Sequence, residues 1–281
     1  MFVCGDARKL PLRDETVQCA VTSPPYFQLR DYRCGERQIG LEATPEAYIA
    51  ALVEAFREVR RVLRPDGVLW LVLGDCYWGM NSGQRSVRHP TLKSKDLIGA
   101  PWRVAFALQA DGWYLRADVI WAKPNPMPEP VRDRPTRSHE YVFLLSKSRR
   151  YYYDADAIAE PAVSDHPSAN RFHRPHGRTR GNRGNNTFWT AVGGKRNCRD
   201  VWQLKSEPTT EAHYATFPAE LARRCVLTGS QPADLVLDPF AGAGTVGWVC
   251  EELSRRWIGI DLQTEYGGIA QRRTAQRGFL F

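Results

Sequence analysis

The 281-residue sequence lacks any apolar run approaching the roughly 20 residues that a membrane-spanning helix needs. This absence argues against a helical membrane protein. Its first residues, MFVCGDARKL, contain an acid and no apolar core, so we expect no signal peptide. The seven cysteines are odd in number, widely spaced and form no C-x-x-C pair, so no zinc site is indicated. A disulfide framework is equally unexpected, and a reduced cytoplasmic setting fits best.

Acidic residues are missing from one long stretch, residues 166–199. The chain has 39 Lys and Arg against 31 Asp and Glu, and this stretch holds the entire excess of eight. Basic side chains neutralise phosphates, and interleaved aromatic ones such as Phe172, Phe188 and Trp189 can stack on bases. A solvated loop is the alternative interpretation, but the concentration of charge favours contact with nucleic acid. The predicted DNA-binding residues are Arg171, Arg174, Arg178, Arg180, Arg183, Lys195, Arg196 and Arg199.

A stiff turn follows the strand predicted at residues 17–22. It consists of Ser23, Pro24, Pro25 and Tyr26. Two consecutive prolines remove two backbone donors and fix two φ angles, and each disfavours helix in the residue before it. The turn therefore presents free carbonyl groups, a hydroxyl group and an aromatic ring, which suits gripping a flat polar group such as a nucleobase. An ordinary loop is the competing interpretation.

Strand-like and helix-like segments alternate along the chain, which is typical of an α/β domain with a mainly parallel sheet. The first predicted helix has Thr44 as its N-cap and Pro45 at its first position. Residues 76–98 are expected to form a loop, and 155–205 an insertion without clear periodicity. Helices are predicted at about 45–63, 101–110, 218–227, 245–253 and 265–277, and strands at 2–4, 17–22, 68–73, 114–122, 141–146, 235–237 and 257–260.

A glycine-rich motif, DPFAGAGT at residues 238–245, follows the predicted strand at 235–237. Its G-x-G-x-x-G spacing from Gly242 matches the dinucleotide-binding fingerprint, with Asp261 19 residues later. A nicotinamide oxidoreductase is therefore one alternative. Asp238 argues against it, because a carboxylate there would repel a pyrophosphate at the helix N-terminus. S-adenosylmethionine carries an ammonium and a sulfonium group and no phosphate, so it suits this acid better.

The motifs TSPPY and DPFAGAGT together resemble those of the DNA methyltransferases that methylate exocyclic amino groups. The resemblance covers nearly the whole chain. In that family the first strand carries the cofactor glycines and the fourth carries the Pro-Pro-Tyr tetrad, whereas here the tetrad comes first, as in the permuted beta group. The resemblance implies a circularly permuted, Rossmann-like methyltransferase fold. Residues 1–154 would be its catalytic half, 155–205 an inserted target-recognition segment and 206–281 its cofactor-binding half.

The resemblance also implies roles for individual residues. Asp6, which alone would be interpreted as a turn acid, matches the acid that contacts the cofactor's adenine amino group. Residues 213–218 resemble the stretch that holds the methionine part, and Asp261 is placed to accept both ribose hydroxyl groups. No metal is expected. The predicted catalytic residues are Ser23, Pro24, Pro25 and Tyr26, and the predicted cofactor-binding residues are Asp6, Thr216, Phe217, Asp238, Phe240, Gly242, Gly244, Thr245 and Asp261.

The tetrad suggests a mechanism for methylating a base that has been flipped out of the duplex. The Ser23 hydroxyl group and the Pro24 carbonyl group are predicted to accept the two amine hydrogens, which aims the nitrogen lone pair at the sulfonium methyl group. Tyr26 is predicted to stack on the base. Ser23 is not a plausible base at neutral pH, so the proton leaves to water. Most of the rate then comes from positioning and electrostatics.

The target base is only partly indicated. Within the family, Ser before Pro-Pro-Tyr is associated with cytosine-N4 methylation and Asp with adenine-N6 methylation. We favour cytosine, and adenine is the alternative because both bases offer an amine to the same acceptors. A methyltransferase of RNA or of a small molecule is a further alternative, and the long basic insertion argues against the small molecule.

A remote alternative is a catalytically inactive DNA-binding protein on this fold. Such a protein would be expected to have lost Ser23, Tyr26, Asp238 or the glycines, and all are present. The expected partner is double-stranded DNA, and a homodimer and a cognate restriction endonuclease are left open. The expected setting is the cytoplasm of a prokaryote, with a bacterial or phage gene and association with the nucleoid.

Overall fold

The computed structural model describes residues 1–79, 89–161, 195–206 and 217–275. Its main feature is an eight-stranded sheet with the order β1-β10-β9-β2-β3-β5-β4-β8. Five neighbouring strands, from β1 to β3 in this order, are parallel, β5 is antiparallel to β3 and β4, and β8 is parallel to β4. The strands are β1 (Phe2–Cys4), β2 (Val17–Thr22), β3 (Leu63–Leu73), β4 (Tyr114–Ala122), β5 (His139–Ser146), β8 (Val201–Gln203), β9 (Leu235–Asp238) and β10 (Arg256–Asp261).

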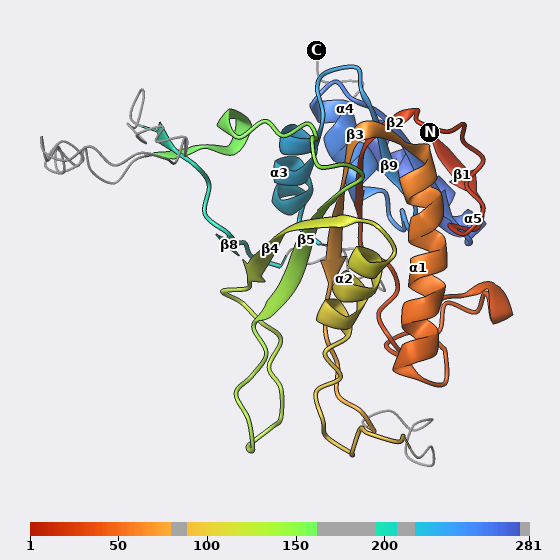
Figure 1. The fold of residues 1–281 in the computed structure, drawn as a ribbon, viewed down its shortest axis with the longest axis vertical. Helices are drawn as coiled ribbons and strands as arrows, with labels where there is room; N and C mark the ends of the chain where they lie inside the picture. The colour runs from red at the N-terminus through yellow and green to blue at the C-terminus, as the bar shows by residue number, and fades with distance from the viewer. Residues whose placement is uncertain (80–88, 162–194, 207–216, 276–281) are drawn as a thin grey trace, which may run out of the picture.

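Helices cover both faces of the sheet (Figure 1). Helices α1 (Pro45–Val62) and α2 (Ala100–Ala110) pack on one face, and α3 (Ala219–Gly229), α4 (Thr245–Glu252) and α5 (Thr264–Ala275) on the other. A hydrophobic core lies on each face of the sheet. Alternate side chains of each strand pack into one core or the other, because successive side chains of a strand point to opposite faces. This three-layer arrangement confirms the predicted Rossmann-like α/β fold. Among the helices of the described residues, none is both long and apolar enough to cross a membrane.

Helix α1 begins where its capping residues predict. The Thr44 hydroxyl oxygen accepts a hydrogen bond from the backbone N–H of Ala47 at 3.2 Å, and Pro45 is the first helical residue. Its C-terminal end differs from the expectation. The sequence predicts that the next strand begins at residue 68, but β3 already starts at Leu63, which pairs with Val17 ahead of an irregularity in the register. Burial of Leu63 against the core holds this residue in the extended conformation.

Strand β8 was not predicted, since it lies within the segment 155–205. Its three residues are too short to show a period, and its pairing with β4 places Trp202 opposite Trp121. The Trp202 ring is buried and lies 5.9 Å from the Trp70 ring. The end of the segment therefore belongs to the main sheet. Two short 3₁₀ helices, η1 (Gly35–Arg37) and η2 (Asp156–Ile158), and a small sheet of β6 (Glu160–Pro161) and β7 (Lys195–Arg196) complete the described elements.

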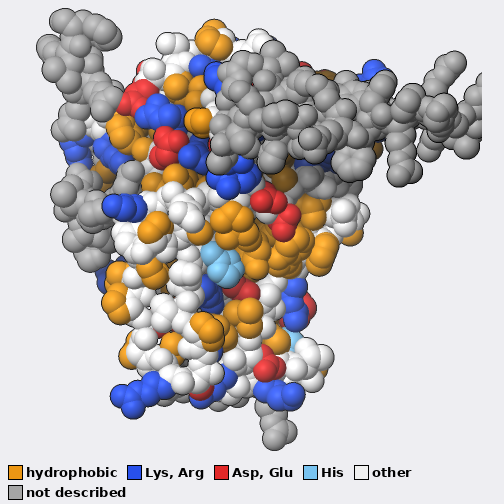
Figure 2. All heavy atoms as spheres, turned by 90° about the vertical axis from the view of Figure 1, so that its left-hand side faces the viewer, with side chains coloured by type: hydrophobic (Ala, Val, Ile, Leu, Met, Phe, Trp, Pro, Cys, Tyr) orange, Lys and Arg blue, Asp and Glu red, His pale blue; other side chains and the backbone are white. Residues whose placement is uncertain are grey.

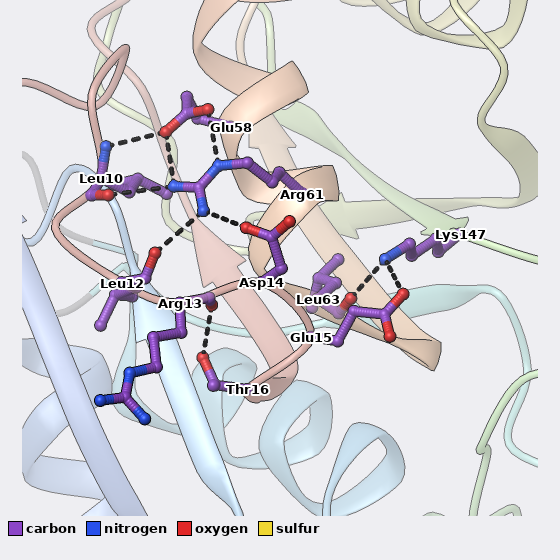
Figure 3. Close-up of polar contacts among 10 residues, drawn as sticks. All are labelled: Leu10, Leu12, Arg13, Asp14, Glu15, Thr16, Glu58, Arg61, Leu63 and Lys147. Carbon is purple, nitrogen blue, oxygen red and sulfur yellow. Dashed lines mark hydrogen bonds and ion pairs between the residues drawn. The ribbon is translucent and has the colours of Figure 1, made fainter.

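Arg61 of α1 anchors the segment that follows β1 (Figure 3). Its guanidinium group donates to the carbonyl oxygens of Leu10 and Leu12 at 3.0 and 2.9 Å. It also forms ion pairs with Glu58 at 2.8 Å and Asp14 at 2.6 Å, and these raise the pKa of Arg61. One side chain thus holds the path of the chain between β1 and β2 against α1.

Candidate active site

The two sequence motifs start from neighbouring strands. Strands β2 and β9 are parallel, with Ala20 opposite Leu237. The chain proceeds from β9 to β10 on one side and from β2 to β3 on the other, so this pair is the point where the strand order reverses. Ligands of open α/β sheets bind at the carboxyl ends of the strands at such a point. The structure therefore brings the tetrad and the glycine motif to one place.

A cavity lies at this edge of the sheet. Its volume is about 950 Å³, including the part open to solvent, which is in the range of small-molecule sites. Its lining includes most of the predicted site residues, namely Asp6, Ser23, Pro25, Phe217, Asp238, Phe240, Gly242, Thr245 and Asp261.

The other predicted site residues are placed differently. Pro24 is buried and Tyr26 half-buried, both beside the cavity rather than in its lining. Gly244 has a positive φ of 76°, and a Cβ atom there would lie 2.7 Å from the Cβ of Ala270. It lets α4 begin close to α5, and its contact with the cofactor stays a prediction. Thr216 lies outside the described residues.

Asp238 is a buried carboxyl group at the end of β9, only 4% exposed. Its Oδ1 accepts hydrogen bonds from the Thr22 hydroxyl group at 2.7 Å and from the Phe240 N–H at 3.1 Å. Burial raises its pKa to about 7, and the two hydrogen bonds only partly oppose this. Within the described part of the chain both bonds end on Oδ1, so Oδ2 is the oxygen left to accept from a ligand. A cationic ligand there would restore the charged carboxylate.

Two further carboxyl groups line the cavity, and both also brace its wall. Asp261 accepts hydrogen bonds from the N–H groups of Gly242 and Gln263, each at 3.0 Å, and burial raises its pKa. Asp6 is partly buried, which alone would raise its pKa, but hydrogen bonds and an ion pair with Arg8 lower it. Three carboxyl groups in one cavity disfavour a pyrophosphate and fit a cation such as S-adenosylmethionine.

The Tyr26 side chain is held at three points. A Cβ atom on Gly74, which follows β3, would lie 2.5 Å from its ring, so the ring crosses the end of β3 in direct contact with the backbone. Its hydroxyl group donates to Glu140 of β5 and accepts from the Ser23 hydroxyl group at 3.3 Å.

The Pro25 carbonyl oxygen accepts from Tyr48 at 2.9 Å. Of the two proline carbonyl groups, that of Pro24 thus remains the predicted acceptor for a substrate amine.

Comparison with known proteins decides the family. The model of the DNA methylase family that methylates N6 and N4 amino groups matches residues 17–272. The chain belongs to this family. It is 50% identical to the Type II methyltransferase M.SmaI of Serratia marcescens, over 98% of this chain and 91% of the relative. It is 47% identical to the Type II methyltransferase M.Cfr9I of Citrobacter freundii, over 96% of this chain and 85% of the relative.

Solved structures agree. A Thermus thermophilus protein in complex with S-adenosyl-L-methionine aligns with a TM-score of 0.63 and 26% identity, covering all of this chain and 95% of that one. The PvuII DNA methyltransferase, described as cytosine-N4-specific, aligns with a TM-score of 0.70, covering 99% of this chain and 87% of that one. At 20% identity the second likeness shows the fold alone. The protein is a DNA methyltransferase whose cofactor is S-adenosylmethionine.

Part of the cavity lining in this DNA methyltransferase was not foreseen. The loop between the tetrad and α1 lines it through Arg30, Tyr32, Cys34, Arg37, Gln38 and Ile39. Gln38 holds this loop together, since its side chain donates to the Arg30 carbonyl oxygen and accepts from the Tyr32 N–H. The loop has no periodicity and only the short η1 helix, so the sequence offers no signal for it.

Only three of the eight predicted DNA-binding residues lie within the part of the chain that the structure describes. Arg171, Arg174, Arg178, Arg180 and Arg183 lie outside the described residues. Lys195 and Arg196 form β7, and Arg196 and Arg199 both pair with Glu160, at 3.1 and 3.0 Å. Figure 2 shows the face of the molecule beside β8. In its described part, the continuous hydrophobic area is larger than any group of Lys and Arg side chains, and these groups lie around it. The DNA-binding assignments therefore stay predictions.

We expect the affinity for S-adenosylmethionine to increase with pH between 5.5 and 7. The pKa of Asp238 in the free protein is about 7, so its carboxyl group is mostly neutral at the lower pH and must lose a proton to pair with a cation. Affinity should rise roughly tenfold over this interval, measured by isothermal titration calorimetry. Asp238→Asn is the control, because it removes the titrating group. An equally steep rise of affinity in the variant would show that another titrating group causes the pH dependence.

Gly74→Ala should impair turnover without impairing cofactor binding. The new methyl group would displace the Tyr26 ring, whereas Gly74 does not line the cofactor cavity. We expect kcat to fall by about tenfold or more, since small misplacements of a positioning group are costly, and the dissociation constant for S-adenosylmethionine to change less than twofold. Thermal unfolding of both proteins checks that the loss of rate is not a loss of folded protein.

Proposed function

We propose that this DNA methyltransferase transfers a methyl group to the N4 amine of cytosine within a specific duplex sequence. The observation that carries the proposal is the position of Ser23. It precedes Pro24-Pro25-Tyr26, it lines the same cavity as Asp238, and its neighbour Thr22 is hydrogen-bonded to Asp238 across the strand ends. The amine acceptor and the cofactor site are thus adjacent. Serine at this position is the variant that the family associates with cytosine.

The first task of the site is to hold the methyl donor. S-adenosylmethionine supplies an electrophilic methyl group when bound. The Asp238 carboxylate, which lines the cavity, would pair with its positively charged end, and Asp261 and Asp6 would face its ribose and adenine groups. The buried setting strengthens the charge pairing, because few water molecules compete for Asp238.

The second task is to prepare the amine. Its lone pair is conjugated with the base, which makes it a weak nucleophile. The Ser23 hydroxyl oxygen and the Pro24 carbonyl oxygen accept its two hydrogens, so that the lone pair is directed toward the methyl group. Tyr26 stacks on the flipped base. The amine gives up its proton to water after transfer, and the protein contributes chiefly by positioning.

The duplex sequence would be read by the segment 155–205, between the catalytic half at 1–154 and the cofactor-binding half at 206–281. Its arginine residues are suited to guanine edges and to phosphates. Because the relatives at 46–50% identity are Type II methyltransferases, we also propose that the protein works beside a restriction endonuclease with the same recognition sequence.

The test is to identify the methylated nucleoside. The protein is incubated with duplex DNA of mixed sequence and S-adenosylmethionine labelled in its methyl group, and the DNA is digested to nucleosides. We expect the label in N4-methyldeoxycytidine. Label in N6-methyldeoxyadenosine would overturn the choice of base, and unlabelled DNA would overturn the activity. A reaction without the protein serves as the control for label that is not enzymatic.

A further inference from the structure

Glu140 connects the tetrad to a strand that is not its neighbour. The tetrad follows β2, Glu140 lies on β5, and β3 runs between these two strands. Tyr26 spans this distance because Gly74, at the end of β3, has no side chain in its way. The Tyr26 hydroxyl group then donates to Oε2 of Glu140. The contact joins residues 114 positions apart in the sequence.

Lys123 holds the other carboxylate oxygen of Glu140. Its ammonium group forms an ion pair with Oε1 and lies 4.3 Å from the centre of the Trp121 ring. Trp121 pairs with Glu140 between β4 and β5, so the ion pair is braced by the sheet itself. Both charged side chains are mostly buried, with 20% of Lys123 and 15% of Glu140 exposed. Such a pair is much less screened than a surface one.

The chemistry of this chain of groups sets the direction of each hydrogen bond. A carboxylate oxygen can only accept, so the single hydrogen of the Tyr26 hydroxyl group goes to Glu140. The Tyr26 oxygen is then an acceptor, and the Ser23 hydroxyl group, 3.3 Å away, donates its single hydrogen to it. The lone pairs of the Ser23 oxygen are what remains for a substrate.

We propose that Glu140, held by Lys123, is a positioning residue that makes Ser23 a hydrogen-bond acceptor toward the substrate amine. The proposal rests on the proposed function, in which Ser23 accepts an amine hydrogen. Without the carboxylate, the Ser23 hydroxyl group could rotate and point its own hydrogen at the amine nitrogen. That orientation would occupy the lone pair that has to attack the methyl group.

Glu140→Gln tests the direction of these hydrogen bonds with little change in the shape of the side chain. The amide can offer an N–H to the Tyr26 oxygen, which removes the preference. We expect kcat to fall by about 10- to 100-fold, less than the roughly 100- to 1,000-fold for loss of a group that contacts the transition state directly, because Glu140 acts through Tyr26 and Ser23. The dissociation constant for S-adenosylmethionine should change less than twofold, because Glu140 does not line the cofactor cavity. A merely structural role would not divide the two measurements in this way.

The matched control is another pair of glutamate and lysine. Glu15 forms an ion pair with Lys147 at 3.2 Å, at the opposite end of β2 from the tetrad (Figure 3). Glu15→Gln should leave kcat unchanged. Tyr26→Phe removes the hydroxyl group in the middle of the chain and keeps the ring, so it should lower kcat by a similar factor to Glu140→Gln. Both variants break the same series of hydrogen bonds, from Glu140 through Tyr26 to Ser23. The double variant should therefore be no slower than the slower single variant.

Several outcomes would overturn the proposal. These are an unchanged kcat in Glu140→Gln or in Tyr26→Phe, multiplied losses in the double variant, or equal losses of kcat and cofactor affinity. If Glu140→Gln does not fold, Tyr26→Phe decides alone. The wild-type protein separates this proposal from the proposed function, because a wild type that leaves DNA unmethylated contradicts the function itself.

Discussion

Asp238→Asn is expected to weaken S-adenosylmethionine binding by roughly 100-fold, which corresponds to about 2.7 kcal/mol. Removing one partner of a desolvated charge pair costs about 2–5 kcal/mol. We expect the lower part of this range, because the asparagine oxygen can still accept from Thr22 and Phe240. Isothermal titration calorimetry with the purified proteins measures the loss. An affinity within a few-fold of the wild type would show that Oδ2 does not face the cation.

The same substitution should make the protein without ligand more resistant to unfolding at high pH. Burial raises the pKa of Asp238 from its ordinary value of 3.8 to about 7. A raised carboxyl pKa means that the folded state holds a proton that the unfolded state releases, so this group's contribution to stability is lost as pH rises toward 7. Asparagine has no such loss. Melting temperatures at pH 5 and pH 8 should therefore show an advantage for the variant that grows with pH.

These two effects of Asp238→Asn have opposite signs, and together they are diagnostic. A substitution that only damaged the fold would lower both affinity and melting temperature. Weaker binding in a protein that is more stable at pH 8 indicates a buried charge retained for its ligand. Thr22→Val is a useful companion, because it removes the hydroxyl group that bonds Oδ1 and leaves the charge in place. We expect it to bind the cofactor better than Asp238→Asn does.

Tyr26→Ala is expected to lower kcat by about 1,000-fold, the product of the lost stacking and the lost hydroxyl group, while the dissociation constant for S-adenosylmethionine changes less than twofold. Stacking on a base is worth about 1–3 kcal/mol per base, and the substitution also removes the hydrogen bonds to Ser23 and Glu140. Tyr26 does not line the cofactor cavity. Methyl transfer in single turnover and calorimetry with the cofactor alone measure the two quantities separately.

Comparison with Tyr26→Phe separates the contribution of the Tyr26 ring from that of its hydroxyl group. The phenylalanine ring can still stack, so it should lose less activity than alanine. If alanine and phenylalanine are equally slow, the hydroxyl group alone matters and the stacking role is wrong. If the alanine variant loses cofactor affinity as much as turnover, Tyr26 supports the cavity rather than the base.

Much of the candidate site could be predicted from local stereochemistry. Consecutive prolines stiffen a turn wherever they occur, so Pro24 and Pro25 identified the strand end that carries Ser23. A glycine-rich turn between a buried strand and a helix identified the other strand end, and the carboxyl group of Asp238 indicated a cationic ligand. The N-cap of α1 was equally local, since Thr44 bonds a group three residues away. Each of these predictions depends on a few consecutive residues.

The parts of the fold that could not be predicted depend on distant pairing. Strand β8 has three residues, and only its position beside β4 makes Trp202 part of the core. The extension of β3 back to Leu63 depends on its pairing with Val17. The loop that lines the cavity has no periodicity, because the Gln38 side chain bonds the loop's own backbone, at the Arg30 carbonyl group and the Tyr32 N–H, and no regular neighbouring element does so. No local rule produces these features.

The sequence by itself determined the chemistry of this methyltransferase: a turn that presents acceptors to an amine, an acid suited to a cationic methyl donor, and a segment of concentrated positive charge. Tertiary structure alone decided how these groups act together. It placed Thr22 against Asp238 across 216 residues and carried Tyr26 over Gly74 to Glu140. It also buried Asp238 deeply enough to raise its pKa. The reason is physical, since side-chain chemistry is encoded residue by residue, whereas burial and the direction of a hydrogen bond exist only once strands distant in sequence lie side by side.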